Sequence, residues 1–397
     1  MNEMNNNQYT CAERVNQVEE YYFSRKLREV AQMKAAGIDV ISLGIGSPDM
    51  PPSTPTIETL CEEAKKEDVH GYQPYTGIPQ LRQGFADFYQ QQYGVTLQPE
   101  NEILPLIGSK EGILHITLAL VNPGEKVLVP NPGYPTYTSL SRLLGAEVIH
   151  YDLMEECQWM PDFEQLEKLD LSDVKLMWTN YPHMPTGKNA TTQLYAKLVD
   201  FGRQNNIIIV NDNPYSMILN DNPLSIMQIE GAKDGCIELN SMSKSHNMPG
   251  WRLGMIATNP TFLNWIIKVK SNIDSGMFRP LQLAAAKALH NLPEWHEEMN
   301  IKVYKRRREL AQEIMKVLQC TYDDTQVGMF LWGKLPDHVK DVQKLVDELL
   351  QEAHVFITPG FIFGTNGSRY IRLSLCCKEY QLQQALQRVK NYCNRKI

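Results

Sequence analysis

The sequence predicts an α/β protein with two domains. Residues 207–210 (Ile-Ile-Ile-Val) form a continuous apolar run, as is typical of a strand buried on both faces in a parallel sheet. Residues 103–107 are a second apolar run, which leads through Gly108 into an apolar helical pattern, the strand–turn–helix order of α/β proteins. The chain has 397 residues, more than one minimal core needs, so we expect two domains.

The composition is that of an ordinary globular protein, with 43% hydrophobic and 21% charged residues. The formal net charge of −7 at pH 7 argues against a nucleic-acid partner or a membrane surface. No apolar run approaches the roughly 20 residues that span a bilayer. These features predict a protein with no nucleic-acid partner and no membrane partner.

The cysteines indicate a reducing compartment. Eight cysteines are scattered without C-x-x-C spacing, and Cys376 and Cys377 are adjacent in an apolar run, so we expect no disulfide framework and no metal site. Residues 1–16 are polar and rich in asparagine, unlike a signal peptide. The sequence therefore predicts a cytoplasmic protein.

The first quarter of the chain combines helices with irregular segments. Residues 20–36 have helical spacing, and residues 39–45 are a short apolar strand that enters a Gly/Pro turn. Residues 70–82 hold two glycines and two prolines, so we expect an irregular segment with a helix that begins near Pro79.

The turn at Gly108 predicts an anion site. A glycine turn that opens a helix presents free backbone N–H groups and the positive end of the helix dipole. The N–H groups of Ser109 and Lys110 would therefore bind a phosphate, with the Ser109 hydroxyl as a further donor. The alternative is an ordinary helix start, since many helices begin at Gly-Ser.

Further strands are expected at residues 126–129 and 174–179, each followed by a proline-rich loop. The apolar run at residues 207–210 delivers Asp212 and, three residues later, Tyr215. Residues 212–214 (Asp-Asn-Pro) also favour a plain turn.

Lys244 lies just past another apolar run, residues 236–239. An unpaired ammonium at the end of a buried strand is costly to desolvate, and a Schiff base with an aldehyde is one reason to place a lysine there. The hydroxyls of Ser241 and Ser243, with the guanidinium of Arg252, would then hold a phosphate dianion. The alternative is a Ser/Gly/Pro loop with Arg252 in a surface ion pair.

The last third is expected to be helical at residues 295–318 and 339–352. Residues 359–364 (Pro-Gly-Phe-Ile-Phe-Gly) then lead to residues 370–374 (Tyr-Ile-Arg-Leu-Ser). An arginine such as Arg372 in an apolar strand is seldom a plain core residue.

Taken in order, these segments resemble the class I and II aminotransferases of the aspartate aminotransferase superfamily, which depend on pyridoxal 5'-phosphate (PLP) and have fold type I. The resemblance runs from about residue 21 to the C-terminus. It implies a large PLP-binding domain, residues 50–285, around a mostly parallel seven-stranded sheet. A smaller α+β domain would contain residues 1–49 and 286–397, and the protein would be a homodimer with each active site at the interface.

The resemblance also implies the role of each site residue. Lys244 would hold PLP and move the α-proton, and Asp212 would keep the pyridine nitrogen protonated. Tyr215 would donate to the 3′-oxygen, Tyr134 would stack on the ring, and Arg372 would bind the α-carboxylate through two parallel N–H···O bonds.

The remaining implied roles concern the two ends of the ligand. Asn180 and the backbone at Gly46 would contact the substrate carboxylate, and Tyr72 would reach the cofactor phosphate of the other subunit. A turn glycine and a packing tyrosine are the ordinary readings of Gly46 and Tyr72. The remaining phosphate ligands would be Ser109, Lys110, Ser241, Ser243 and Arg252.

Met184 departs from the family pattern. The usual string is N-x-P-x-N-P-T-G, and residues 180–187 read Asn-Tyr-Pro-His-Met-Pro-Thr-Gly. The second asparagine normally bonds the 3′-oxygen, so its loss is expected to raise the pKa of the Schiff base at Lys244. The neighbouring His183 is the residue to inspect for compensation.

Lys270 and Arg279 are the cations to inspect for a distal substrate carboxylate, because the family places residues 269–282 near the partner subunit's active site. For each of them, solvated charge or structural pairing is the favoured reading.

The sequence therefore predicts an aminotransferase that moves an amino group from an L-amino acid to a 2-oxo acid. One alternative is a PLP-dependent β-C–S lyase on the same fold, which Met184 slightly favours. The other is a non-catalytic binding protein, against which the intact Lys244, Asp212 and Arg372 argue. No DNA-binding segment precedes the core, and the side-chain specificity stays open.

Overall fold

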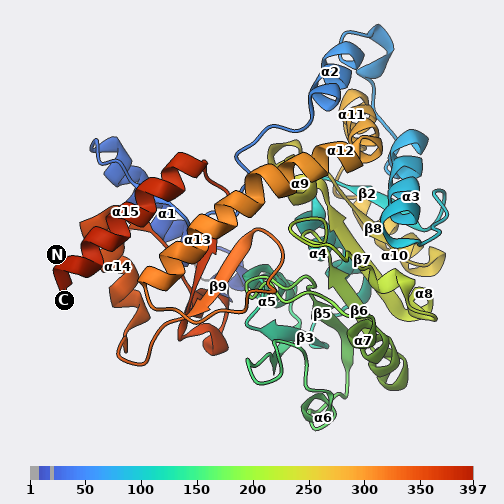
Figure 1. Ribbon diagram of the computed structural model, residues 1–397. Coiled ribbons are helices and arrows are strands. Elements are labelled where there is room, and N and C mark those ends of the chain that lie inside the picture. Colours follow the sequence, from blue (N-terminus) through green and yellow to red (C-terminus); the bar gives the residue numbers. More distant parts are fainter. Residues whose placement is uncertain (1–8, 18–21, 397) are drawn as a thin grey trace.

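The computed structural model describes residues 9–17 and 22–396 and contains two groups of elements (Figure 1). The larger group is built on a seven-stranded sheet. Its strands are β2 (Ile103–Leu106), β3 (Lys126–Asn131), β4 (Glu147–Asp152), β5 (Val174–Thr179), β6 (Ile208–Asp212), β7 (Cys236–Ser241) and β8 (Gly254–Ala257).

The strand order is β2-β8-β7-β6-β5-β3-β4. Strand β8 runs antiparallel to both of its neighbours, and the other pairs are parallel. The predicted α/β fold with a mostly parallel seven-stranded sheet is confirmed. Because parallel strands end at the same edge, the residues that follow β5, β6 and β7 come together there.

Both faces of this sheet are covered, so neighbouring residues of one strand enter different cores. In β6, Ile209 packs into the core on one face and Val210 into the core on the other, which explains the uninterrupted apolar run. The helices of this group are α2 (Thr54–Glu63), α3 (Pro79–Tyr93), α4 (Ser109–Leu120), α5 (Pro135–Leu143), α6 (Phe163–Leu166), α7 (Thr192–Asn205), α8 (Ala232–Gly235), α9 (Met242–Ser245), α10 (Pro260–Lys270) and α11 (Arg279–His290).

The second group draws on both ends of the described chain (Figure 1). Its own apolar core joins residues 30–43 to residues 299–392. The predicted division into residues 50–285 against 1–49 and 286–397 stays a prediction. The elements are α1 (Tyr22–Ala35), β1 (Ile41–Ser42), α12 (Leu292–Glu297), α13 (Lys305–Val317), β9 (Phe330–Lys334), α14 (Val342–Ala353), β10 (Val355–Phe356), β11 (Thr358–Pro359), β12 (Tyr370–Ser374) and α15 (Glu379–Lys396).

Short helical turns complete the structure. A π-helix, Glu298–Tyr304, separates α12 from α13, so the helix predicted over residues 295–318 is not uniformly α-helical. The predicted strand at residues 39–45 is shorter than expected, and the first two residues of the predicted helix 20–36 lie outside the described residues. The 3₁₀ turns are Glu13–Gln17, Glu67–Val69, Ile226–Gln228, Pro249–Trp251, Gly360–Phe363 and Thr365–Gly367.

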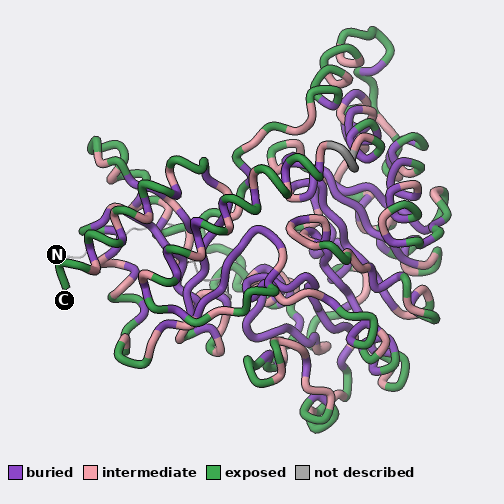
Figure 2. The backbone as a smooth tube through the Cα atoms, in the orientation of Figure 1, coloured by how far each residue is buried: buried purple, intermediate pink, exposed green. Residues whose placement is uncertain are grey.

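Buried backbone fills the sheet and the interior of the second group, and exposed backbone follows the outer helices and loops (Figure 2). All eight cysteines are free thiols. Among the described residues, no helix combines the length and the apolar character needed to cross a bilayer.

Candidate active site

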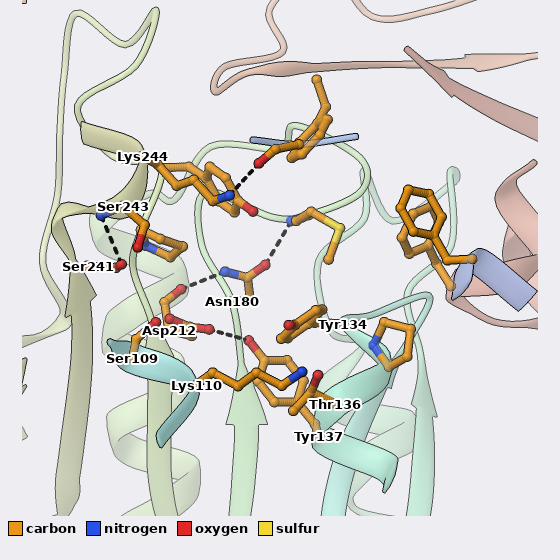
Figure 3. A pocket seen from close by; sticks show the side chains of 18 of the residues that line it. Ser109, Lys110, Tyr134, Thr136, Tyr137, Asn180, Asp212, Ser241, Ser243 and Lys244 are labelled. Atoms are coloured by element: carbon orange, nitrogen blue, oxygen red, sulfur yellow. Dashed lines mark hydrogen bonds between the residues drawn. The ribbon is translucent and has the colours of Figure 1, made fainter. Parts of the chain in front are cut away.

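A cavity of about 540 Å³ lies where β5, β6 and β7 end, between the sheet and the second group of elements. Helices α4, α5 and α9 supply one wall, and β9, β12 and the turn Gly360–Phe363 supply the other. Every predicted site residue except Tyr72 lines it, and Figure 3 labels eight of them around the cavity, among them Lys244, Asp212 and Asn180. The predicted residues that line it are Gly46, Ser109, Lys110, Tyr134, Asn180, Asp212, Tyr215, Ser241, Ser243, Lys244, Arg252 and Arg372.

Lys244 reaches the cavity from the short helix α9, one turn after the end of β7. Ser241 caps this helix, since its hydroxyl accepts from the Ser243 N–H at 3.2 Å. The Lys244 Nζ donates to the Gly46 carbonyl. Burial is the main influence that lowers the pKa of Lys244, and the nearby Arg372 cation lowers it further. A lysine of this kind is more readily neutral, as a nucleophilic amine requires.

Asp212 ends β6 on the floor of the same cavity. Its Oδ2 accepts from the Tyr137 hydroxyl at 2.8 Å, and its Oδ1 is buried with no hydrogen-bond partner among the described residues. Burial raises the pKa of Asp212 to about 6, although the Tyr137 hydrogen bond opposes the shift. A buried carboxylate oxygen without a partner fits a protonated ring nitrogen as its donor.

Tyr137 is a site residue that the sequence analysis missed. It lies in the first turn of α5, stacks on Trp178 at 5.1 Å between ring centroids, and meets the ring of Tyr134 edge-on at 5.5 Å. The signal was present, because Tyr134 directly precedes a helix that begins with proline, and position 137 is one turn further along.

The helix α4 supplies the predicted anion end of the cavity. Gly108 precedes the helix with a left-handed φ of 82°, and Ser109 and Lys110 are its first residues. The positive φ strains any other residue at position 108, and a Cβ there would also displace the guanidinium of Arg252, so glycine suits this turn. Arg252 Nη1 also lies 3.5 Å from the Ser243 hydroxyl. Hydroxyls, a guanidinium and a helix N-terminus thus converge on one spot, which suits a phosphate.

Arg372, at the centre of β12, supplies the opposite wall. Its Nη2 donates to the Gly44 carbonyl at 2.8 Å, and its Nη1 lies 3.2 Å from the Met184 sulfur. The guanidinium packs on the rings of Phe330 and Phe363, at 3.9 and 4.6 Å from their centroids. Burial lowers its pKa to about 10, so it stays cationic at neutral pH. Its Nε is buried without a partner among the described residues, which leaves a donor for a carboxylate.

One segment joins these groups. The backbone carbonyls of residues 44–46 each accept a hydrogen bond from a side chain of the cavity or its wall. The three bonds are Arg372 to Gly44, Ser374 to Ile45 and Lys244 to Gly46.

Asn180 and Met184 form a turn after β5. The Asn180 amide donates to the Asp212 carbonyl at 2.6 Å and accepts from the Met184 N–H at 2.9 Å, so one amide hydrogen remains for a ligand. Met184 points its sulfur to Arg372 and offers no amide. His183 is buried, bonds Thr186 at 2.8 Å and does not line the cavity, so it does not replace the missing asparagine there.

Tyr215 and Tyr134 line the cavity as predicted, but three other inspected residues do not. Tyr72 is 94% exposed on the surface. Lys270 is buried among acidic side chains, and Arg279 lies 3.4 Å from Asp68. The favoured reading of both cations is solvated charge or structural pairing, and the structure shows each of them in an ion pair.

In the protein without a bound ligand, we expect the free energy of unfolding to fall as the pH rises from about 4 to about 6. The pKa of Asp212 rises from 3.8 to about 6 on folding, so the folded state holds the extra proton in this window and ionisation favours unfolding. Such a difference corresponds to about 3 kcal/mol. Urea unfolding of wild type and Asp212→Asn across this range measures it. A stability difference between the two that does not change with pH would contradict the burial of this carboxyl.

Comparisons with known proteins agree with this geometry. The model of the family "Aminotransferase class I and II" matches residues 38–389. The LL-diaminopimelate aminotransferase of Dehalococcoides mccartyi is 36% identical over 383 residues, covering 96% of this chain and 98% of the relative. That of Oleidesulfovibrio alaskensis is 38% identical over 385 residues, covering 96% and 99%.

Solved structures of known proteins are also similar to this chain over nearly its whole length. The substrate-bound BacF structure from Bacillus subtilis has a TM-score of 0.91 and 34% identity, covering 97% of this chain and 98% of that one. An aminotransferase from Staphylococcus aureus has a TM-score of 0.87 and 27% identity, covering 97% and 99%.

Proposed function

The chain belongs to the class I and II aminotransferases and moves an amino group from an amino acid to a 2-oxo acid, and we propose that it does so with PLP held at Lys244. The family uses PLP, and the named relatives favour transfer over the β-C–S lyase alternative. The rest of the proposal assigns roles to the residues of the cavity.

One observation carries the cofactor assignment. The buried Asp212 Oδ1 has no partner among the described residues, and it lines the same cavity as the amine of Lys244 and the guanidinium of Arg252. PLP has a ring nitrogen, an aldehyde and a phosphate, which are the three groups that these side chains would bind. The phosphate would take the α4 N-terminus at Ser109 and Lys110, with the further ligands Ser241, Ser243 and Arg252.

When bound, PLP supplies an aldehyde and an electron-withdrawing ring. The protein's part is to bind, orient and move protons. Arg372 would hold the α-carboxylate with two N–H donors, assisted by Asn180 and the backbone at Gly46. That contact would direct the Cα–H bond toward the Lys244 amine, which acts as general base and then as general acid.

Four residues would set the electronic state and the position of the ring. Asp212 would keep the ring nitrogen protonated, with Tyr137 holding the carboxylate in place through its hydrogen bond. Tyr215 would donate to the 3′-oxygen, and Tyr134 would stack on the ring face and exclude water. Met184 stands in the place of the usual asparagine and has no amide to donate. Of these residues, Tyr215 would therefore be the one that donates to the 3′-oxygen.

Two donor classes follow from different observations. The names of the relatives suggest LL-diaminopimelate as an amino donor. The wall of the cavity is aromatic at Phe23, Phe330, Phe361 and Phe363, which favours an aromatic amino acid. Both belong in the first substrate screen.

We also propose a cytoplasmic homodimer. Tyr72 and Tyr75 are exposed in one loop, and Ile273 and Phe278 are exposed in another. The pairing of Gln73 with Gly276 places these loops side by side, so they form one apolar patch suited to an interface between chains. A second copy would bring its own Tyr72 to the phosphate end of the cavity. The eight free thiols suit a reducing compartment.

The experiment that tests the proposal supplies the purified protein with PLP, 2-oxoglutarate and single amino acids. Formation of glutamate, with bleaching of the visible absorbance band by the donor alone, is expected for LL-diaminopimelate, an aromatic amino acid, or both. Cystathionine is included in parallel, since release of pyruvate and ammonia would reveal elimination. A protein that shows no visible band with PLP would overturn the cofactor assignment.

A further inference from the structure

Four ionisable side chains meet in the interior beside the first turns of α4, outside the catalytic cavity. Lys270, the last residue of α10, places its Nζ 3.2 Å from Glu111 Oε1 and 2.5 and 2.7 Å from the two oxygens of Asp274. His115 Nε2 lies 2.6 Å from Glu111 Oε1 and 3.6 Å from Asp274 Oδ2. Only 2% of the Lys270 side chain is exposed.

The lysine is the cation of this cluster. Glu111, His115 and Asp274 are near enough to one another to serve as metal ligands, but the ammonium of Lys270 already contacts both carboxylates. Burying an ammonium is unfavourable unless it is paired. The pairing with two acids therefore holds Lys270, Glu111 and Asp274 in one arrangement.

Glu111 connects the cluster to the predicted phosphate site. It is the third residue of α4, and its second oxygen, Oε2, accepts from the Ile107 N–H at 2.6 Å. This resembles a capping box, in which an acidic side chain of the first turn bonds backbone just before the helix. Ile107 directly precedes Gly108, whose left-handed φ of 82° sets the direction of the turn. The Glu111 carboxylate thus fixes the backbone that presents the N–H of Ser109.

Asp274 connects the cluster to a different part of the surface. It lies in the loop after α10, where its N–H donates to the Lys270 carbonyl at 3.1 Å. Two residues on, Gly276 pairs with Gln73, and a Cβ at Gly276 would collide with the backbone of residues 73 and 74. The cluster therefore lies between the loop that carries Tyr72 and the turn that opens α4.

We propose that Lys270 is a positioning residue for the cofactor phosphate: with Asp274 it holds Glu111, and Glu111 holds the Ile107–Gly108 turn so that the α4 N-terminus faces the phosphate. This inference rests on the proposed PLP site. Lys270 does not line the cavity, so its effect is expected only at the phosphate end of the ligand.

The test compares two probes that differ only in the phosphate. Full-length protein stripped of cofactor is titrated with PLP and, separately, with pyridoxal, and the visible absorbance gives both dissociation constants. Lys270→Met is expected to weaken PLP binding about tenfold, because a misdirected helix N-terminus loses part of its attraction for an anion. Pyridoxal has no phosphate, so its affinity is expected to stay at the wild-type value.

Asp274→Asn is the milder second variant, because it keeps the size of the side chain and a hydrogen-bonding oxygen for Lys270. It is expected to shift the ratio of the two dissociation constants in the same direction by a smaller factor. Lys233→Met is the control, since it removes another lysine–carboxylate pair, with Glu102 at 2.8 Å, and is expected to leave the ratio unchanged.

The outcomes separate this inference from the proposed function. Wild-type protein that binds neither probe would refute the PLP site itself. If wild type binds PLP and the variants lose affinity for PLP and pyridoxal by the same factor, the cluster is purely structural and the inference is overturned. The same conclusion follows if the variants unfold at a lower temperature while the ratio of the two dissociation constants stays unchanged. A selective loss for PLP in both cluster variants supports it.

Discussion

Lys244→Ala is expected to remove the visible absorbance of the PLP complex and to lower kcat for transamination by at least about 10²- to 10⁴-fold, the range for loss of a general acid–base group. The alanine supplies neither the amine that attaches the cofactor nor the base that takes the α-proton. The measurement is a spectrum of the reconstituted protein together with steady-state glutamate formation.

Lys168→Ala is a suitable control, because Lys168 is exposed and does not line the cavity. It should keep both the spectrum and the rate of wild type. A Lys244→Ala protein that retains the visible band would mean that another amine attaches PLP, and the assignment of the catalytic lysine would then be wrong.

Arg372→Lys is expected to lower kcat/KM for the amino donor by at least about 30-fold, because truncating a buried, hydrogen-bonded charge pair costs about 2 to 5 kcal/mol. A lysine keeps the charge but cannot offer two parallel N–H donors, and it loses the packing on Phe330 and Phe363. We expect the loss for amino acids and 2-oxo acids alike, since both carry the carboxylate. The affinity for PLP should stay near the wild-type value.

Arg369→Lys tests whether any arginine in this region has the same effect. Arg369 precedes β12 and donates to the carbonyls of Leu335 and Pro336 rather than to the cavity. Its variant should keep the kcat/KM of wild type. If Arg372→Lys also keeps it, a different cation binds the carboxylate.

Parts of the fold can be predicted from short local patterns in the sequence. The apolar run at residues 207–210 and the glycine turn at 108 recur as β6 and the start of α4, because a strand buried on both faces and a helix that opens on glycine leave clear signals over a few residues. Strands that are short or end in irregular turns are harder to bound, and β1 covers two residues where seven were expected.

The site is predictable where each residue belongs to a local motif. Lys244, Asp212 and Arg372 each follow or occupy an apolar strand, and the structure places all three at one cavity; their roles come from the family resemblance and stay predictions. Tyr137 could not be assigned, since its bond to Asp212 joins residues 75 positions apart. The sequence marks Lys270 only as a cation to test for contact with a distal substrate carboxylate. In the structure it pairs with Glu111, which lies 159 positions away in the sequence. Such contacts depend on the packing of whole helices, which no local pattern encodes.

The three neighbouring carbonyls of residues 44–46 have a mechanical consequence. Arg372 donates to the Gly44 carbonyl and Lys244 donates to the Gly46 carbonyl, so one three-residue stretch of backbone holds both cations. A carboxylate that replaced Gly44 as the partner of Arg372 would leave this stretch with one tie fewer, next to the bond that holds the Lys244 amine.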